Sequence, residues 1–322
     1  MGIVTKSIGT SSRDYSTVQA WEDALPANLV TDTNSQVGEC YNDSEFDENI
    51  IISGETTSAL YTITLTTASG ESFRDDANVQ SNALKYNQSN GVAIKCTNGY
   101  GTTLQVGAVN YCTVSNLQLK ATAGSGVALD TTLAQGTCNY KYLIVEGSGY
   151  GSYLCRGTFT SSLFVQRGSG KTNIVYVYYG GIFNNCTFAC PTGIAVKPTY
   201  AFSGYSSPSP IFTNCAFFGS NVFTDGGGSA GIYLTCYTDA TSPPVGFVTA
   251  TYDNNLFVDT TDDWRLLTGS ALLDVGTTYF DIVGTARPQN SLADVGAWEL
   301  VVSSPAPSSG GGGEGKSNYM RG

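Results

Sequence analysis

One short pattern recurs between Tyr111 and Val258, and it constrains the fold more than any other feature of the sequence. Each copy is a short polar step, often Asn, followed by a few β-branched, aromatic or Cys residues. The polar step is occupied by Asn116, Tyr142, Ser162, Asn185, Asn214 and Asn254. Successive copies lie about 20 to 30 residues apart, with one longer step, and such a loose period indicates a solenoid.

The chemistry of the repeat decides which kind of solenoid the chain forms. Its apolar runs span about four to six residues, too short for helices, and they are rich in β-branched and aromatic residues. Gly, Ser, Thr and Asn lie between the runs and supply the backbone conformations that corners need. A leucine-rich frame is missing, and Asn98 with Gly99 is the one candidate for a tight hairpin turn. We therefore predict an all-β parallel β-helix with coils about 4.8 Å apart, Asn stacked at one corner, and Phe, Leu and Cys inside.

Composition narrows the classes of function. Charged residues make up only 13% of the chain, whereas Gly (38), Tyr (20) and Phe (14) are plentiful, which suits a stacked β surface and argues against disorder. The net charge of −11 argues against nucleic acid or an anionic membrane as a partner. No stretch reaches the apolar length of a membrane span. Because the sequence contains no His, a Ser-His-Asp or Cys-His mechanism is excluded.

The N-terminus and the cysteines indicate a reducing compartment. Residues 1–6 lack the charged and apolar regions of a signal peptide, so we expect synthesis in a cytoplasm. The cysteine count is odd, and most cysteines sit inside strand-like runs, so we interpret them as small buried hydrophobes. They are Cys40, Cys96, Cys112, Cys138, Cys155, Cys186, Cys190, Cys215 and Cys236. Cys186 and Cys190 lack the partners of a metal site, and we predict no cofactor.

The chain divides into three regions. Residues 1–30 are predicted to form an N-terminal cap of one strand and one helix, and residues 31–302 the parallel β-helix. Residues 303–322 are rich in Gly, Ser and Pro, which is typical of a flexible linker with a C-terminal arm.

The cap helix has its own signals. Residues 16–19 fit a capping box, and Val18, Trp21 and Leu25 fall at helical spacing before Pro26 stops the helix. A short helix with Trp on its apolar face is suited to covering the open end of the first coil, which would otherwise expose a strand edge and the core.

Both ends of the chain resemble known β-helix proteins. Residues 273–276, 281–288 and 294–299 resemble the C-terminal signature of right-handed parallel β-helix proteins. Residues 13–22 resemble the N-terminal cap of β-helix proteins encoded among bacteriophage structural genes. The resemblance implies a single-stranded right-handed parallel β-helix with a short N-terminal capping helix. It does not imply one activity, because this fold hosts lyases, hydrolases, adhesins and virion parts.

Paired carboxylates are the one catalytic chemistry that the sequence leaves open. The candidates are Asp75 with Asp76, Asp130 with Glu146, and Asp253 with Asp259, Asp262 or Asp263. Each is more typical of a solvated loop or turn, and the cluster from Asp259 to Asp263 is also a candidate for Ca²⁺. The run 168–172 ends like a phosphate-binding loop, but Val165 stands where that motif requires Gly. We therefore predict no catalytic, cofactor-binding or metal-binding residue.

From the resemblance we predict a virion structural protein of a bacteriophage, not an enzyme. The first expectation is a capsid decoration or stabilising protein that attaches to other virion proteins through its terminal arm. The predicted partner-binding residues are Lys316, Asn318, Tyr319, Met320 and Arg321. The alternative is a tail-associated spike protein that binds or depolymerises a host glycan. Either function is compatible with a trimer or another homo-oligomer, and either places the protein in the virion after synthesis in the host cytoplasm.

Overall fold

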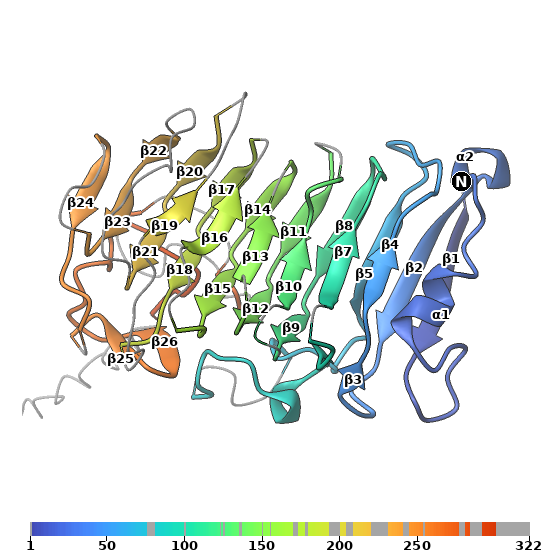
Figure 1. Cartoon of the computed structure of the whole chain (residues 1–322), viewed down its shortest axis with the longest axis horizontal. Helices are drawn as coiled ribbons and strands as arrows, with labels where there is room; N and C mark the ends of the chain where they lie inside the picture. The colour runs from blue at the N-terminus through green and yellow to red at the C-terminus, as the bar shows by residue number, and fades with distance from the viewer. Residues whose placement is uncertain are drawn as a thin grey trace, which may run out of the picture.

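The computed structural model shows an elongated stack of parallel coils (Figure 1). The coils follow one another along the long axis, from α1 (Val18–Glu22) and β1 (Gly2–Ile8) at one end to β24 (Phe247–Thr249) at the other. The structure describes residues 2–300 except 76–80, 100, 123, 125, 135–136, 150, 155, 170–172, 178–179, 193–199, 204–208, 220–230, 241–244, 254, 277–280 and 284–291. The predicted all-β parallel β-helix is confirmed. No helix in the described ranges is long and apolar enough to cross a membrane.

Three parallel sheets form the walls of the stack. Sheet A consists of β1, β2 (Asn34–Cys40), β5 (Ile63–Thr67), β8 (Cys112–Ser115), β11 (Asn139–Lys141), β14 (Thr158–Thr160), β17 (Ile182–Asn184), β20 (Ile211–Thr213) and β22 (Ile232–Leu234). Sheet B consists of β4 (Ile50–Ile52), β7 (Thr102–Val106), β10 (Val127–Asp130), β13 (Gly151–Leu154), β16 (Asn173–Val177) and β19 (Tyr200–Ser203). Sheet C consists of β3 (Phe46–Asp47), β6 (Ala93–Cys96), β9 (Gln118–Ala121), β12 (Ile144–Gly147), β15 (Leu163–Gln166), β18 (Thr187–Ala189), β21 (Ala216–Phe218), β23 (Cys236–Thr238) and β24.

From β2 to β20 the coils pass through the sheets in the same order. The chain runs from sheet A to sheet C, then to sheet B, and returns to sheet A one coil further on, as β8, β9, β10 and β11 show. The remaining elements are the antiparallel hairpin of β25 (Phe257–Asp259) and β26 (Asp263–Leu266), the helix α2 (Leu29–Asp32), and a 3₁₀ turn at Gln88–Asn90. Strands that are adjacent in a wall are therefore separated by a whole coil in sequence.

One residue with a positive φ marks the corner between sheets A and C in successive coils. These residues are Asn116, Tyr142, Ser161, Asn185, Asn214 and Thr235. The predicted corner is confirmed, with Ser161 in place of Ser162 and Thr235 in place of Asn254, which lies outside the described residues. Asn tolerates this backbone conformation better than most residues. The predicted stacking of Asn side chains is confirmed where Asn214 Nδ2 donates to Asn185 Oδ1 at 2.5 Å.

Aromatic rings stack along the axis inside the coils. In sheet A the ring centroids of Tyr140, Phe159, Phe183 and Phe212 are 4.7 Å apart at each step. In sheet C those of Phe164, Phe188 and Phe217 are 5.1 and 4.6 Å apart. These spacings match the roughly 4.8 Å between hydrogen-bonded strands, so each ring lies on the ring of the previous coil. The cysteines within the described ranges are buried and free, which confirms the prediction of small buried hydrophobes.

The N-terminal helix closes the first coil, as predicted. Its N-cap is Thr17 and not Ser16, because Thr17 Oγ1 accepts a hydrogen bond from the backbone N–H of Ala20 at 3.1 Å. Trp21 is 1% exposed and belongs to the interior cluster. Both carboxylate oxygens of Glu48 accept hydrogen bonds from backbone N–H groups in the first turn, at 2.9 and 3.0 Å. A carboxylate at this position satisfies helix N–H groups that lack partners within the helix.

After the hairpin β25–β26 the chain runs back across the outer face of sheet C (Figure 1). A second hydrophobic cluster lies there, outside the coils. Sheet C contributes Ile144, Leu163, Val165, Ala189, Ala216 and Phe218. The hairpin contributes Trp264, and the returning segment contributes Leu272, Ile282, Val295, Ala297 and Trp298. The backbone N–H of Ala297 donates to Thr187 Oγ1 at 2.9 Å, and that of Gly296 donates to the Asn214 carbonyl at 3.0 Å. The C-terminal signature therefore fastens the return to sheet C.

Two carboxyl groups, those of the buried Glu22 and the half-buried Glu55, lie close together at the N-terminal cap. The backbone N–H of Ser53 donates to Glu22 Oε1 at 3.0 Å, and Gln19 Nε2 donates to Glu22 Oε2 at 2.9 Å. Burial, together with the charge and hydrogen bond of the neighbouring Glu22, raises the pKa of Glu55 to about 7. Burial also raises the pKa of Glu22. Within the described residues, neither carboxyl group forms an ion pair.

Substitution of Gly296 by Ala should destabilise the return more than the same substitution at Gly269. Both glycines have a positive φ, of 92° and 90°, so each substitution carries the left-handed strain of about 1–2 kcal/mol. An added Cβ at Gly296 would also lie 2.6 Å from Thr187 Oγ1, whereas nothing lies within 4 Å at Gly269. Overpacking adds about 1–3 kcal/mol at Gly296 alone. Urea unfolding of both variants measures the difference, and equal losses would contradict tight docking at Thr187.

The stability of the protein should fall as pH rises from about 5 to about 8. A carboxyl group whose pKa is raised by folding holds more protons in the folded state, so its contribution is lost as pH rises through the folded-state value of about 7. The absence of His leaves few other groups that titrate in this window. Thermal unfolding across this range should show the slope in the wild type and a weaker one in Glu55→Gln. An unchanged slope in the variant would contradict the assignment to this pair.

Candidate functional site

Charged side chains follow one another across the strands on the outer face of sheet C. Asp47 of β3 is paired in register with Lys95 of β6, which is paired with Lys120 of β9, which is paired with Glu146 of β12. Their sequence neighbours Ile94, Leu119 and Val145 point into the core, so the alternation of a strand directs the charged row outward.

Glu146 is the centre of a cluster that joins three parts of the chain. Lys120 Nζ lies 2.7 Å from Glu146 Oε1, and Arg167 Nε lies 2.6 Å from Glu146 Oε2. Arg167 Nη2 also lies 2.6 Å from Asp262 Oδ1, and Lys85 Nζ contacts the other oxygen of Asp262. We call these five residues the Glu146 cluster. It links sheet C to the loop before β6 and to the hairpin β25–β26.

Exposure differs sharply within the Glu146 cluster. The Glu146 side chain is 3% exposed and that of Asp262 is 40% exposed. Burial alone would raise the pKa of Asp262, but hydrogen bonds and the charges of Lys85 and Arg167 outweigh it and hold that pKa below its ordinary value. Burial alone would lower the pKa of Arg167, but the charges and hydrogen bonds of Glu146 and Asp262 outweigh it and raise that pKa. Asp262 is therefore an ionised, accessible carboxylate between two cations, suited to accept a proton or attack an electrophile.

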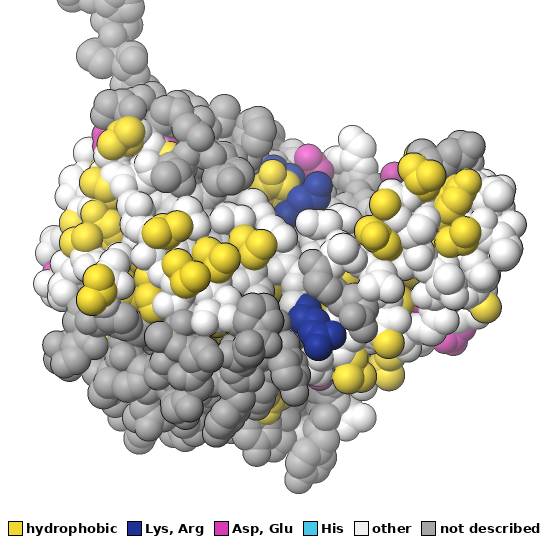
Figure 2. Space-filling model, turned by 90° about the horizontal axis from the view of Figure 1, so that it is seen from above, with side chains coloured by type: hydrophobic (Ala, Val, Ile, Leu, Met, Phe, Trp, Pro, Cys, Tyr) yellow, Lys and Arg dark blue, Asp and Glu magenta, His cyan; other side chains and the backbone are white. Residues whose placement is uncertain are grey.

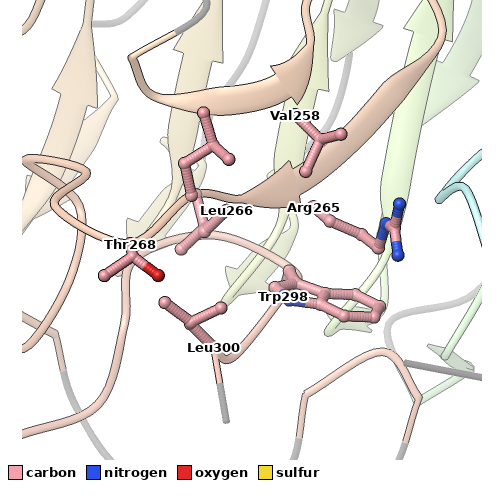
Figure 3. Close-up of a pocket in the computed structure, with 7 residues that line it drawn as sticks. Val258, Arg265, Leu266, Thr268, Trp298 and Leu300 are labelled. Atoms are coloured by element: carbon pink, nitrogen blue, oxygen red, sulfur yellow. The ribbon is translucent and has the colours of Figure 1, made fainter. Parts of the chain in front are cut away.

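A pocket of about 280 Å³ lies further along β26, between the hairpin and the returning segment (Figure 3). It is lined by Val258, Arg265, Leu266, Leu267, Thr268, Trp298 and Leu300. In Figure 3, Trp298 and Leu300 lie across from Leu266 and Thr268, and the side chain of Arg265 lies beside the indole. We call this the Trp298 pocket. It combines an aromatic ring, aliphatic side chains, a guanidinium and a hydroxyl group.

The strand β26 connects the Trp298 pocket to the Glu146 cluster. Arg265 Nη2 lies 2.6 Å from Asp263 Oδ2, and Asp263 Oδ1 accepts a hydrogen bond from the backbone N–H of Leu84 at 2.9 Å. Between these two positions, the ring of Trp264 lies 5.5 Å from the guanidinium carbon of Arg167. Strand β26 and the turn that precedes it thus place the guanidinium of Arg265 in the Trp298 pocket and the carboxylate of Asp262 in the Glu146 cluster.

Most of the carboxylates considered from the sequence serve as turn residues. Asp130 accepts hydrogen bonds from the N–H and hydroxyl of Thr132 at 2.9 and 2.7 Å, and it lies in sheet B, whereas Glu146 lies in sheet C. Asp253 accepts from the N–H of Asn255 at 2.8 Å. The candidate pair of Asp130 and Glu146 is thus divided between two sheets.

The candidate Ca²⁺ residues do not converge. Asp259 accepts from the N–H of Thr261 at 2.7 Å, whereas Asp262 and Asp263 are paired with Arg167 and Arg265. Across the described residues, no group of three or more Cys, Asp or Glu side chains is arranged to hold a metal ion. Asp76, the run 170–172, and the arm residues Lys316, Asn318, Tyr319, Met320 and Arg321 lie outside the described part.

The sequence did not identify the basic residues of the Glu146 cluster. Lys120 and Arg167 each follow a repeat copy by a few residues, where a charge is typical of a solvated surface. Asp262 and Arg167 are 95 positions apart, so no local pattern connects them. The only signal was Glu146 itself, a charge at an outward position of an otherwise apolar strand.

The surface of sheet A carries exposed apolar side chains. Ile182 of β17 is 44% exposed, and Ile232 and Leu234 of β22 are 49% and 52% exposed. Figure 2 shows one face of the molecule, on which hydrophobic side chains gather toward both ends and Lys and Arg lie between them. The exposed side chains of Ile182, Ile232 and Leu234 are all aliphatic, whereas the Trp298 pocket combines apolar and polar groups.

No protein-family model matches the sequence, and a search of curated proteins found no match. Solved structures do share its fold. A pectin methylesterase from Aspergillus niger is 14% identical with a TM-score of 0.48, over 77% of this chain and 81% of that one. A carrot pectin methylesterase is 10% identical with a TM-score of 0.48, over 78% and 77%. The pectate lyase Pel9A is 12% identical with a TM-score of 0.37, over 92% and 97%.

At these identities the likeness concerns the fold alone, which is a parallel β-helix. The prediction that the chain is not an enzyme disagrees with these comparisons, since the similar solved structures are enzymes; the likeness itself assigns no activity to this chain. The comparisons lend no support to a bacteriophage origin or to capsid decoration.

Replacing Glu146 by Gln should cost more stability than replacing Lys120 by Met. The first change leaves two partly buried cations without their shared carboxylate, and lost hydrogen bonds to charged groups cost about 1.5–3 kcal/mol. The second change leaves Glu146 paired with Arg167 and removes a cation that is 29% exposed, at most about 1 kcal/mol. Urea unfolding measures both, and a larger loss in Lys120→Met would contradict the central position of Glu146.

Proposed function

We propose that the protein binds and processes a glycan, with a sugar unit in the Trp298 pocket and the Asp262 carboxylate acting on it. The observation that carries this proposal is the arrangement along β26. Strand β26 lines a pocket of about 280 Å³ that has an indole, aliphatic walls and a guanidinium, and the turn directly before β26 holds an ionised carboxylate between two cations.

The lining of the Trp298 pocket suits a sugar ring. A sugar has an apolar face of C–H groups and a rim of hydroxyls, so it needs aromatic or aliphatic contact together with a few placed polar groups. Apolar contact is available from Trp298, Leu266 and Val258. The polar groups are those of Arg265 and Thr268. The ion pair with Asp263 holds the Arg265 guanidinium in place, so less side-chain entropy is lost when this guanidinium binds a ligand.

The cluster favours chemistry that begins with proton abstraction or nucleophilic attack. Asp262 is ionised at neutral pH, since its pKa lies below an ordinary value that is itself well below 7, so it can serve as a base or nucleophile but not as a proton donor; the same lowering makes it a weaker base than a free Asp. Arg167 and Lys85 are placed to stabilise negative charge that develops on a substrate. Ester hydrolysis or elimination fits this arrangement better than acid-initiated glycosidic hydrolysis, which needs a protonated carboxyl group.

The bacteriophage setting stays a prediction from the sequence resemblance. So do the virion partners and the attachment through the C-terminal arm, because the arm lies outside the described residues. A glycan-processing role agrees with the tail-spike alternative and does not depend on it.

Asp262→Asn should abolish processing while leaving the fold intact. Loss of a general base or nucleophile lowers the rate by roughly 10²–10⁴. The measurement is product release from a panel of polysaccharides, followed as reducing ends, unsaturated products and released alcohol. Asp253→Asn is the matched control, because Asp253 is an Asp of the same region that bonds only within its own turn.

Two further outcomes decide the proposal. Thr268→Phe should fill the Trp298 pocket and remove glycan binding, with little change in thermal unfolding, because Thr268 lines the pocket outside the hydrophobic clusters. Equal activity of Asp262→Asn and Asp253→Asn would remove Asp262 from the mechanism. Absence of binding and product release across the panel would contradict the proposed function.

A further inference from the structure

A second cavity, of about 320 Å³, lies by the corner between sheets A and C and shares no lining residue with the Trp298 pocket. Glu39 of β2, Thr67 of β5 and the corner residue Asn116 form one part of its wall. Ser69 and Arg74, from the loop that follows β5, form another. We call it the Arg74 cavity.

Arg74 is fixed in place but keeps unused donors. Its Nη1 donates to Asn116 Oδ1 at 2.7 Å, and its guanidinium carbon lies 3.7 Å above the ring of Tyr142. Its Nε is buried and has no hydrogen-bond partner. Burial lowers the pKa of Arg74 despite the opposing effects of Tyr142, Asp281 and Asp75. Among the residues that the structure describes, no carboxylate forms an ion pair with this guanidinium.

Other polar side chains of the cavity make few hydrogen bonds to described residues. Asp75 Oδ2 accepts hydrogen bonds from the backbone N–H groups of Gly70 and Ser72, both at 3.2 Å, which leaves its second oxygen open. The side chains of Glu39, Thr67 and Ser69 make no hydrogen bond to any described residue, although all three line the cavity. The cavity thus presents a guanidinium, two carboxylates and two hydroxyl groups to whatever enters it.

This set of groups selects among ligand classes. Two carboxylates outnumber one guanidinium, so an anion would meet net repulsion, and a metal cation would meet the fixed charge of Arg74. An apolar ligand would leave these polar groups without partners. A sugar offers both donors and acceptors on adjacent hydroxyls, and a cavity near 300 Å³ is within the usual size range for small ligands.

We propose that the Arg74 cavity is a binding site for a neutral sugar unit, held through its hydroxyl groups by Arg74, Glu39 and Asp75. The site is separate from the Trp298 pocket and does not require the activity proposed for Asp262. If both sites are occupied by one glycan, the Arg74 cavity adds affinity without taking part in the chemistry.

The test is ligand-observed NMR titration of the whole protein with glucose, galactose, mannose and N-acetylglucosamine, and with acetate and phosphate as anion probes. At least one sugar should bind saturably. Glu39→Gln should weaken that binding roughly tenfold, because hydrogen bonds to charged acceptors are stronger than those to neutral ones. Ser69→Phe, made in the Thr268→Phe background so that the Trp298 pocket is already closed, should block the cavity from its exposed rim and remove the remaining sugar binding.

The controls separate this site from the first one. Thr268→Phe should leave sugar binding at the Arg74 cavity unchanged, since Thr268 lines only the Trp298 pocket. Sugar binding that is lost in Thr268→Phe and retained in Glu39→Gln would overturn this proposal while supporting the proposed function. Stronger acetate or phosphate binding in Glu39→Gln, without sugar binding in the wild type, would also overturn it.

Discussion

The structure depends on one constraint: every side chain lies directly on the side chain of the neighbouring coil. Parallel pairing fixes the distance between coils at roughly 4.8 Å, so an inward Phe needs a partner that tolerates a ring on each side. The stack from Tyr140 to Phe212 meets that requirement with uniform 4.7 Å spacings. A substitution in the middle of such a stack affects two neighbours at once, because protein interiors are close-packed.

The close spacing of neighbouring coils also limits which charged side chains can lie next to each other on the outer faces of the sheets. Equal charges at one register position would lie within about 5 Å of each other, which is unfavourable. Lys95 and Lys120 do occupy such neighbouring positions, and carboxylates offset their repulsion: Glu45 pairs with Lys95 and Glu146 pairs with Lys120. Arg167 and Asp262 complete the cluster. The hydrophobic remainder of that face is covered by the returning segment. The Glu146 cluster and the Trp298 pocket lie at the margins of this cover.

The sequence allows the coils to be predicted because their repeat is local. Asn116, Asn185 and Asn214 identify the corner directly, whereas Thr235 was missed because its coil lacks Asn there. The return over sheet C could not be predicted, since its contacts join residues such as Thr187 and Ala297 that share no pattern. The Glu146 cluster could not be predicted for the same reason. Each carboxylate, taken singly, was typical of a turn, and only the folded chain brings Arg167 between Glu146 and Asp262.

The central claim is that the margin of the returning segment holds a glycan. A crystal structure of the protein with an oligosaccharide that it binds in solution tests this most directly. The account predicts a sugar ring in the Trp298 pocket, in contact with Trp298 and Arg265, and with its reacting end toward Asp262. An oligosaccharide bound elsewhere, with the Trp298 pocket free of sugar, would contradict it.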